Sequence, residues 1–200
     1  MVTAVVGIVT LGLAVAIVTG TIPFADSTVS TGSTETTGSP GFTGSTEPTA
    51  ADGRVTDGGG VSPFDDSHPT ISRLDPALLT ALREAATAVE QNGSPLHVNS
   101  GWRSAEYQRW LQDEALEKYG SAEEASRWVS SPENSAHVTG DAVDIGPYAT
   151  AEWLSRRGAQ FGLCQIYANE IWHFELRPDA PVEGCPEMYA DASEVQGSGS

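Results

Sequence analysis

Ser-Ala-His-Val-Thr-Gly-Asp-Ala-Val-Asp, at residues 135–144, places one histidine and two carboxylates around a glycine. Glycine adopts backbone conformations that other residues avoid, so Gly140 predicts a sharp turn just after His137. The residues after the turn predict a short strand, whose period of two directs Asp144 away from the buried face. The turn then brings the imidazole of His137 back toward the strand end that carries Asp144, and we expect the fold to form around this pair.

A second histidine lies downstream, in Asn-Glu-Ile-Trp-His-Phe-Glu at residues 169–175. Residues 171–176 are predicted to form a strand. On this strand His173 and Glu175 share one face, while Trp172 and Phe174 are expected to pack on the opposite face. The second segment therefore offers another imidazole and further carboxylates for a shared site.

Two histidines and a carboxylate are a ligand set typical of catalytic zinc, which keeps one coordination position open for water. A further carboxylate beside the metal would act as general base and acid. The residue types alone leave two choices open. Either Asp141 or Asp144 could be the ligand, and either Glu170 or Glu175 could be the base.

Arg103 stands at a predicted junction between a strand over residues 96–100 and a helix over residues 105–119, for which Ser104 is a candidate N-cap. A guanidinium group at such a junction can reach the mouth of an active site. The alternative is a surface role, in which Arg103 pairs with Glu106 or lies along the helix. An earlier helix, which starts at Pro76, is expected to be scaffold.

The composition excludes one class of partner and divides the chain. The formal net charge is −17, with only 10 Lys and Arg among 200 residues, which argues against a nucleic-acid-binding surface.

Residues 1–25 are uncharged and mostly apolar, as in a signal peptide or an N-terminal membrane anchor. Residues 26–62 are rich in Ser, Thr, Gly and Pro and are predicted to be a disordered linker. A folded domain is expected over residues 63–190, followed by a disordered tail over residues 191–200.

The chain has two cysteines, Cys164 and Cys185. In an exported protein an even number favours a disulfide, whereas inside the cell two buried free thiols would be expected. The predicted signal peptide or anchor favours export, so we expect one disulfide. Nothing in the sequence indicates an oligomer, and a monomer is expected.

The pattern Ser135-x-His137-x-x-Gly140-x-Ala142-x-Asp144, followed by Glu170-x-Trp172-His173, resembles the signature of zinc D-alanyl-D-alanine carboxypeptidases and dipeptidases of the vancomycin-resistance (VanY and VanX) type. The similarity covers about residues 74–189. It includes Ser-Gly-Trp-Arg-Ser at residues 100–104 and Tyr107-Gln108, which match the arginine-bearing segment of that family. Each motif alone is modest, but three motifs in the right order are specific.

The resemblance assigns roles that the residue types left open. It implies that zinc is bound by His137, Asp144 and His173, and that Glu170 is the general base and acid. It further implies that the substrate is contacted by Arg103 and, at the peptide terminus, by Gln108 and Ser135. The fold implied is α+β, a small antiparallel sheet with helices on one side and zinc at one end of the sheet.

The function implied is removal of the terminal D-alanine from peptidoglycan stem peptides, by a water that Glu170 activates beside zinc. Such an enzyme would act outside the cytoplasm, secreted or anchored at the bacterial cell envelope. Within the same zinc site, an endopeptidase or an L,D-carboxypeptidase is the alternative. A wall-binding module that keeps zinc without turnover is a third reading, against which Glu170 argues because a pure binder needs no base.

Overall fold

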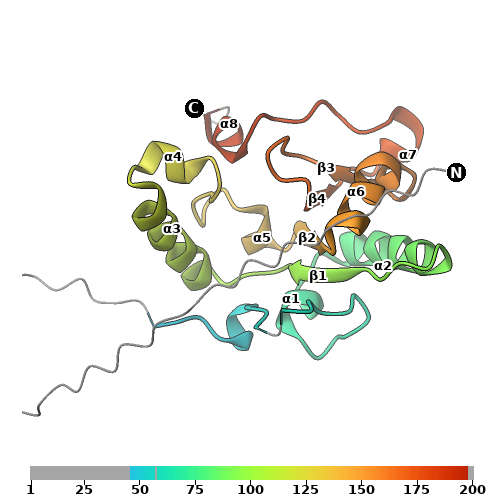
Figure 1. Ribbon diagram of the computed structural model, residues 1–200, viewed down its shortest axis with the longest axis horizontal. Helices are drawn as coiled ribbons and strands as arrows, with labels where there is room; N and C mark the ends of the chain where they lie inside the picture. Colours follow the sequence, from blue (N-terminus) through green and yellow to red (C-terminus); the bar gives the residue numbers. More distant parts are fainter. Residues whose placement is uncertain (1–45, 57, 198–200) are drawn as a thin grey trace, which may run out of the picture. The chain divides into compact units, whose positions relative to one another are not determined.

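The structure, a computed structural model, describes residues 46–56 and 58–197. Its centre is a four-stranded antiparallel sheet with the strand order β1-β2-β4-β3 (Figure 1). The strands are β1 (His97–Ser100), β2 (Ala142–Gly146), β3 (Leu163–Gln165) and β4 (His173–Leu176). The predicted α+β class with a small antiparallel sheet is therefore confirmed.

Ten helical segments surround this sheet within the described residues. The α-helices are α1 (Pro69–Ser72), α2 (Pro76–Gln91), α3 (Ala105–Tyr119), α4 (Ala122–Ser126), α5 (Ala136–Thr139), α6 (Tyr148–Arg157), α7 (Ala180–Glu183) and α8 (Ala192–Gly197). The 3-10 helices are η1 (Ala50–Asp52) and η2 (Gly158–Phe161). Asp75 caps α2 as expected, because its side chain accepts hydrogen bonds from two backbone N–H groups of the first turn.

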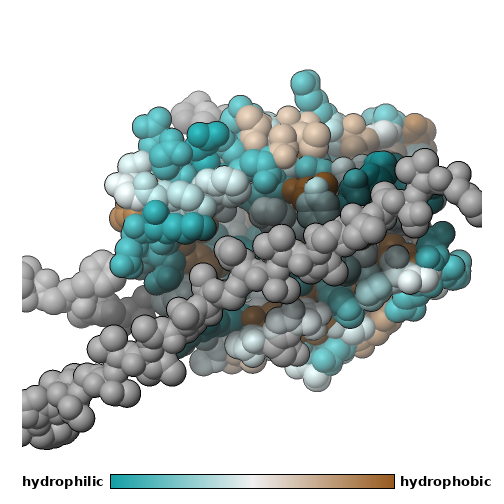
Figure 2. All heavy atoms as spheres, viewed as in Figure 1, coloured by the Kyte–Doolittle hydropathy of each residue, from teal (hydrophilic) through white to brown (hydrophobic). Residues whose placement is uncertain are grey.

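One face of the sheet is apolar and packs against α2 and α6 in a single core cluster. Val143, Ile145 and Phe174 are fully or almost fully buried there, as the strand periodicity predicts. Trp172 differs from the prediction, because it precedes β4 and is 38% exposed. On the face that Figure 2 shows, hydrophilic residues surround smaller hydrophobic patches.

The opposite face of the sheet carries Asp144 and His173, and the short helix α5 lies beside it. Gly140 ends α5 with a φ of +85°, which confirms the predicted turn. A Cβ atom at Gly140 would lie 2.5 Å from the carbonyl oxygen of Arg73, so a side chain would not fit. The carbonyl of Gly140 also accepts a hydrogen bond from the N–H of Asp75, which ties the turn to the start of α2.

The ordered domain begins earlier than the sequence suggested. Val61 pairs with Val98 of β1 through two backbone hydrogen bonds, and Asp52 accepts a hydrogen bond from the hydroxyl of Ser104. Residues 46–56 and 58–62 thus belong to the fold rather than to a linker, because they contact distant parts of the domain and Val61 is buried in its apolar core. The predicted membrane segment, residues 1–25, lies outside the described residues. Among the helices that the structure describes, none combines the length and apolarity needed to cross a membrane.

The C-terminal segment also differs from the predicted disordered tail. It runs back from α7 and ends in α8, which lies beside α4 (Figure 1). Asp191 is 5% exposed and pairs with Arg127 at 2.8 Å. Residues 191–197 therefore form part of the domain, since an ion pair between the half-exposed Arg127 and the buried Asp191 joins two distant segments.

The predicted disulfide is confirmed. Cys164 of β3 is bonded to Cys185, which lies 21 residues further along the chain. The bond ties the C-terminal segment to the edge strand of the sheet. Beyond it, Tyr189 forms backbone hydrogen bonds with Ile166 and Ala168, so the segment continues alongside the residues that follow β3.

Replacing both cysteines by alanine is expected to lower the free energy of unfolding by about 3 kcal/mol, because the open chain gains entropy in the unfolded state. Urea unfolding of the wild type and of the Cys164→Ala/Cys185→Ala variant measures this difference. Met188→Ala is the matched control, because Met188 lies in the same segment and is 47% exposed. An unchanged unfolding midpoint in the double variant would contradict a stabilising role of the disulfide.

Candidate metal centre

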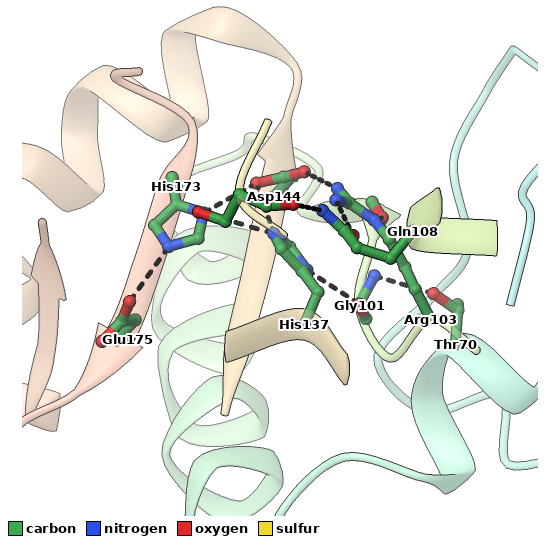
Figure 3. Close-up of polar contacts among 10 residues, drawn as sticks. Thr70, Gly101, Arg103, Gln108, His137, Asp144, His173 and Glu175 are labelled. Carbon is green, nitrogen blue, oxygen red and sulfur yellow. Dashed lines mark hydrogen bonds and ion pairs between the residues drawn. The ribbon is translucent and has the colours of Figure 1, made fainter. Parts of the chain in front are cut away.

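Three side-chain atoms converge at the end of the sheet where β2 and β4 pair (Figure 3). Nδ1 of His173 lies 3.2 Å from Oδ1 of Asp144 and 3.3 Å from Nε2 of His137. The third side of the triangle, from Nε2 of His137 to Oδ1 of Asp144, measures 3.4 Å. The antiparallel register sets Asp144 directly opposite His173, and α5 contributes His137.

The size of this triangle fits one small divalent cation. Zinc–ligand bonds of about 2.0–2.1 Å in a tetrahedron place neighbouring ligand atoms about 3.3 Å apart. The three measured separations, 3.2–3.4 Å, agree with one face of such a tetrahedron. All three residues are buried, so the group is also shielded from bulk water.

The backbone fixes which nitrogen of His137 faces the triangle. Nδ1 of His137 lies 2.8 Å from the carbonyl oxygen of Gly101, which can only accept, so Nδ1 carries the hydrogen and Nε2 presents its lone pair. The N–H of Gly101 in turn donates to the hydroxyl of Thr70 at 2.7 Å. A Cβ atom at Gly101 would lie 2.2 Å from the carbonyl oxygen of Thr70, so only glycine allows this approach.

Two carboxylates flank the ring of His173. On the side away from Asp144, Nε2 of His173 lies 3.2 Å from Oε1 of Glu175 (Figure 3). The second oxygen of Glu175 accepts a hydrogen bond of 2.9 Å from Arg177. In a neutral ring with its hydrogen toward Glu175, the lone pair of Nδ1 faces the triangle.

The electrostatics of the group favour one added positive charge. Burial lowers the pKa of His137, and the guanidinium of Arg103 adds to this effect. Burial alone would raise the pKa of Asp144, yet contacts with His137, His173 and Arg103 hold that pKa well below its usual value. Burial also opposes the charging of His173, but its bonds to Asp144 and Glu175 raise its pKa to about 9. A positive charge on the ring of His173 is thus favoured.

Arg103 is oriented by three acceptors beside the triangle. Its guanidinium donates to Oδ2 of Asp144 at 2.7 Å, to the amide oxygen of Gln108 at 3.2 Å and, through Nε, to the hydroxyl of Ser100 at 2.7 Å. The amide nitrogen of Gln108 donates to the carbonyl of Ser130, so both ends of this buried side chain have protein partners. The surface pairing with Glu106 is therefore wrong for Arg103. In the structure Glu106 lies near Arg109 instead.

Glu170 lines the same cleft as the triangle and is 8% exposed. Its carbonyl accepts a hydrogen bond from the N–H of His173, which places it one turn before β4. Burial and the nearby carboxylate of Asp144 raise the pKa of Glu170 to about 7. A carboxylate with a pKa near neutrality is suited to accept and return a proton.

The cleft has a polar floor and partly apolar walls. Its floor holds the triangle, Arg103 and Glu170, whereas the walls include Leu111, Trp128, Val129, Trp172 and Ala192. Ser135 also lines the cleft, and its hydroxyl makes no capping hydrogen bond to α5. The wall residues come from α3, from the segment after α4, from the turn before β4 and from α8.

The structure separates the two candidate ligands that the residue types left open. Asp144 joins the triangle, whereas Asp141 is exposed and stands outside it. The sequence reasoning did not find the carbonyl of Gly101, the hydroxyl of Ser100 or the contact of Glu175 with His173. The first two have no signal of their own in the sequence. The third could have been found from the shared face of His173 and Glu175 on the predicted strand.

Comparisons with known proteins identify proteins that are similar to this chain in sequence and in fold. A D-alanyl-D-alanine carboxypeptidase of Enterococcus faecalis (strain ATCC 700802 / V583) is 31% identical in an alignment of 142 residues, with 58% of this chain covered. The match spans 52% of that relative, about half of its length.

Two solved structures show the same fold. The L,D-carboxypeptidase LdcB is 20% identical with a TM-score of 0.54, covering 70% of this chain and 75% of its own. The vancomycin-resistance D,D-dipeptidase VanXYg, in complex with a D-Ala-D-Ala phosphinate analogue, is 22% identical with a TM-score of 0.51, covering 72% and 66%.

The model of one protein family, described as VanY D-alanyl-D-alanine carboxypeptidase, matches residues 71–178. This range holds α2, the Arg103 segment, the whole sheet, all three members of the triangle and Glu170. The matched range is more than half of the 200-residue chain, so the protein belongs to the VanY D-alanyl-D-alanine carboxypeptidase family.

Proposed function

We propose that this protein is a zinc-dependent carboxypeptidase that removes the terminal D-alanine from peptidoglycan stem peptides ending in D-Ala-D-Ala. The observation that carries the proposal is the triangle of ligand atoms, 3.2–3.4 Å on a side, in one cleft with the buried Glu170. Membership of the VanY family and the activity named for the Enterococcus faecalis relative support the choice of substrate.

His137, Asp144 and His173 hold the metal in this proposal, through Nε2, Oδ1 and Nδ1. Two imidazole nitrogens and a carboxylate oxygen are ligands that suit zinc. When bound, zinc supplies a Lewis acid and lowers the pKa of a water in its open position. All three residues line the cleft, so water and a peptide could reach an ion held between them.

Glu170 moves the proton in the reaction. Its carboxylate accepts a proton from the attacking water, whose oxygen bonds to the carbonyl carbon between the last two residues of the peptide. The C–N bond then breaks, and Glu170 returns the proton to the departing amine of D-alanine. The apolar walls limit the access of bulk water, which strengthens the charged contacts at the floor.

Arg103 contacts the substrate in this proposal, either at the terminal carboxylate or at the carbonyl oxygen on which charge develops. Its side chain is 13% exposed and lines the cleft, so it can be reached from there. Ser135 contributes a hydroxyl toward the peptide terminus. Gln108 contributes by holding Arg103, because both ends of its amide are already bonded.

We further propose that the protein acts outside the cytoplasm, at the bacterial cell envelope. The Cys164–Cys185 disulfide supports this location, because disulfides persist in oxidising compartments. An L,D-carboxypeptidase remains the second candidate because the LdcB structure has the same fold. The two activities differ in the stereochemistry of the residue before the bond, so paired substrates separate them.

Zinc-loaded protein is expected to release one D-alanine from a pentapeptide ending in D-Ala-D-Ala, and to leave a tetrapeptide ending in a single D-alanine largely uncut. Chelation of the metal should abolish release, and added zinc should restore it, because the water then regains its activation. Chromatography of the products measures both substrates. Faster release from the tetrapeptide would instead establish the L,D-carboxypeptidase.

Glu170→Gln is expected to retain zinc and to lower kcat at least 100-fold, because an amide cannot accept the proton of the attacking water. Zinc content by atomic absorption and D-alanine release are measured on the same preparation. Glu152→Gln is the matched control, since Glu152 pairs with Arg156 on the surface of α6. Unchanged turnover in Glu170→Gln would refute the assigned base.

A further inference from the structure

We infer that Glu175 is a positioning residue of the metal centre, which fixes the ring of His173 with its Nδ1 lone pair toward the metal. The inference rests on the proposed function, because it assumes that His173 is a ligand. From the sequence, Glu175 was only a candidate general base, and the inference gives its carboxylate a structural role. Glu175 acts through His173 and is not proposed to touch the substrate.

The geometry of the strand produces the contact. His173, Glu175 and Arg177 are spaced by two residues along and just beyond β4, so their side chains share one face. Oε1 of Glu175 lies 3.2 Å from Nε2 of His173, and Oε2 accepts a 2.9 Å hydrogen bond from Arg177. A second nitrogen of Arg177 donates to the carbonyl of Leu176 at 2.9 Å, which anchors the guanidinium to the backbone.

The contact matters because His173 stands between two competing carboxylates. Asp144 lies 3.2 Å from Nδ1 and Glu175 lies 3.2 Å from Nε2. A neutral imidazole has one ring hydrogen, and the partner of each nitrogen decides where it resides. If Glu175 were absent, the hydrogen would move to Nδ1, where Asp144 accepts it. That tautomer blocks the nitrogen that must bind the metal.

The arrangement on the two sides of His173 is nearly symmetric. Asp144 uses one oxygen for His173 and the other for Arg103, and Glu175 uses one oxygen for His173 and the other for Arg177. The side chain of Glu175 is 13% exposed, as is that of Asp144, so neither can easily turn to water. Carboxylates that hold the second nitrogen of a ligand histidine set its orientation and basicity in metal sites.

Zinc affinity of the full chain, measured by competition with a chromogenic chelator, tests the inference independently of turnover. Glu175→Ala is expected to bind zinc 10- to 100-fold more weakly than the wild type, as for other residues that hold a ligand histidine. Glu175→Gln is expected to lie between the two, because its amide oxygen can still accept from Nε2–H. The matched control is Glu133→Gln, since Glu133 lines the neighbouring cavity together with Glu175 but bonds with Ser131.

The ring hydrogen of His173 is the second readout, and it needs no variant. In zinc-loaded wild type, long-range proton–nitrogen NMR spectra should show Nδ1 bound to metal and a hydrogen on Nε2. Zinc bound through Nε2 would overturn the inference, as would equal zinc affinity of the wild type and Glu175→Ala. A wild type that binds no zinc would instead refute the proposed function itself, so the two failures are distinguishable.

Discussion

Three candidate ligand atoms that face one another within 3.4 Å are the constraint on which the rest of the structure depends. Such a group repels itself unless a positive charge sits among its members, so the surrounding fold must hold the atoms in place. Three structural features hold these atoms in place. The β2–β4 register sets Asp144 opposite His173, the turn at Gly140 returns α5 to the sheet, and the carbonyl of Gly101 holds the ring of His137. Each feature comes from a different part of the chain, and the apolar core beneath the sheet fixes their relative positions.

Charge alternates along the face of the sheet that bears the centre. Each side chain in this row is bonded to the next, in the order Arg177, Glu175, His173, Asp144 and Arg103. Buried charges are costly unless they are paired, and breaking one pair leaves the partner uncompensated. The row therefore resists rearrangement more strongly than its individual hydrogen bonds suggest. Its two arginines differ in exposure, 13% for Arg103 and 36% for Arg177, and only Arg103 lines the cleft with the triangle. A substrate can thus meet one end of the row while the other end remains structural.

The sequence predicted those parts of the molecule whose residue types have a local signature. Glycine predicted the turn at Gly140, and an Asp-Pro pair predicted the cap of α2. Strand periodicity predicted the buried side of β2, and the cysteine count predicted the disulfide. The choice between Asp141 and Asp144 as the candidate ligand needed the family pattern, because the two residues are chemically alike. Residues 46–56, 58–62 and 191–197 were misplaced because their order comes from long-range contacts, among them the backbone pairing of Val61 with Val98 and the Arg127–Asp191 ion pair. Such contacts join segments far apart in the sequence, and composition contains no record of them. The predicted packing of Trp172 was wrong for a related reason, since an apolar ring is equally compatible with a core and with a cleft.

The walls of the cleft, rather than its floor, are where this chain can select one peptide over another. In the proposed mechanism, the metal ion, Glu170 and Arg103 do not by themselves distinguish a D- from an L-residue before the bond. Discrimination requires surfaces fixed on both sides of the peptide. Trp128 and Ala192 belong to segments that Arg127 and Asp191 bind together, and Trp172 precedes the ligand strand on the sheet side. The disulfide holds the base of the C-terminal segment against β3, so the wall that includes Ala192 is anchored at both ends. An anchored wall would present one shape to the proposed substrate, and such preorganisation favours discrimination between a D- and an L-residue.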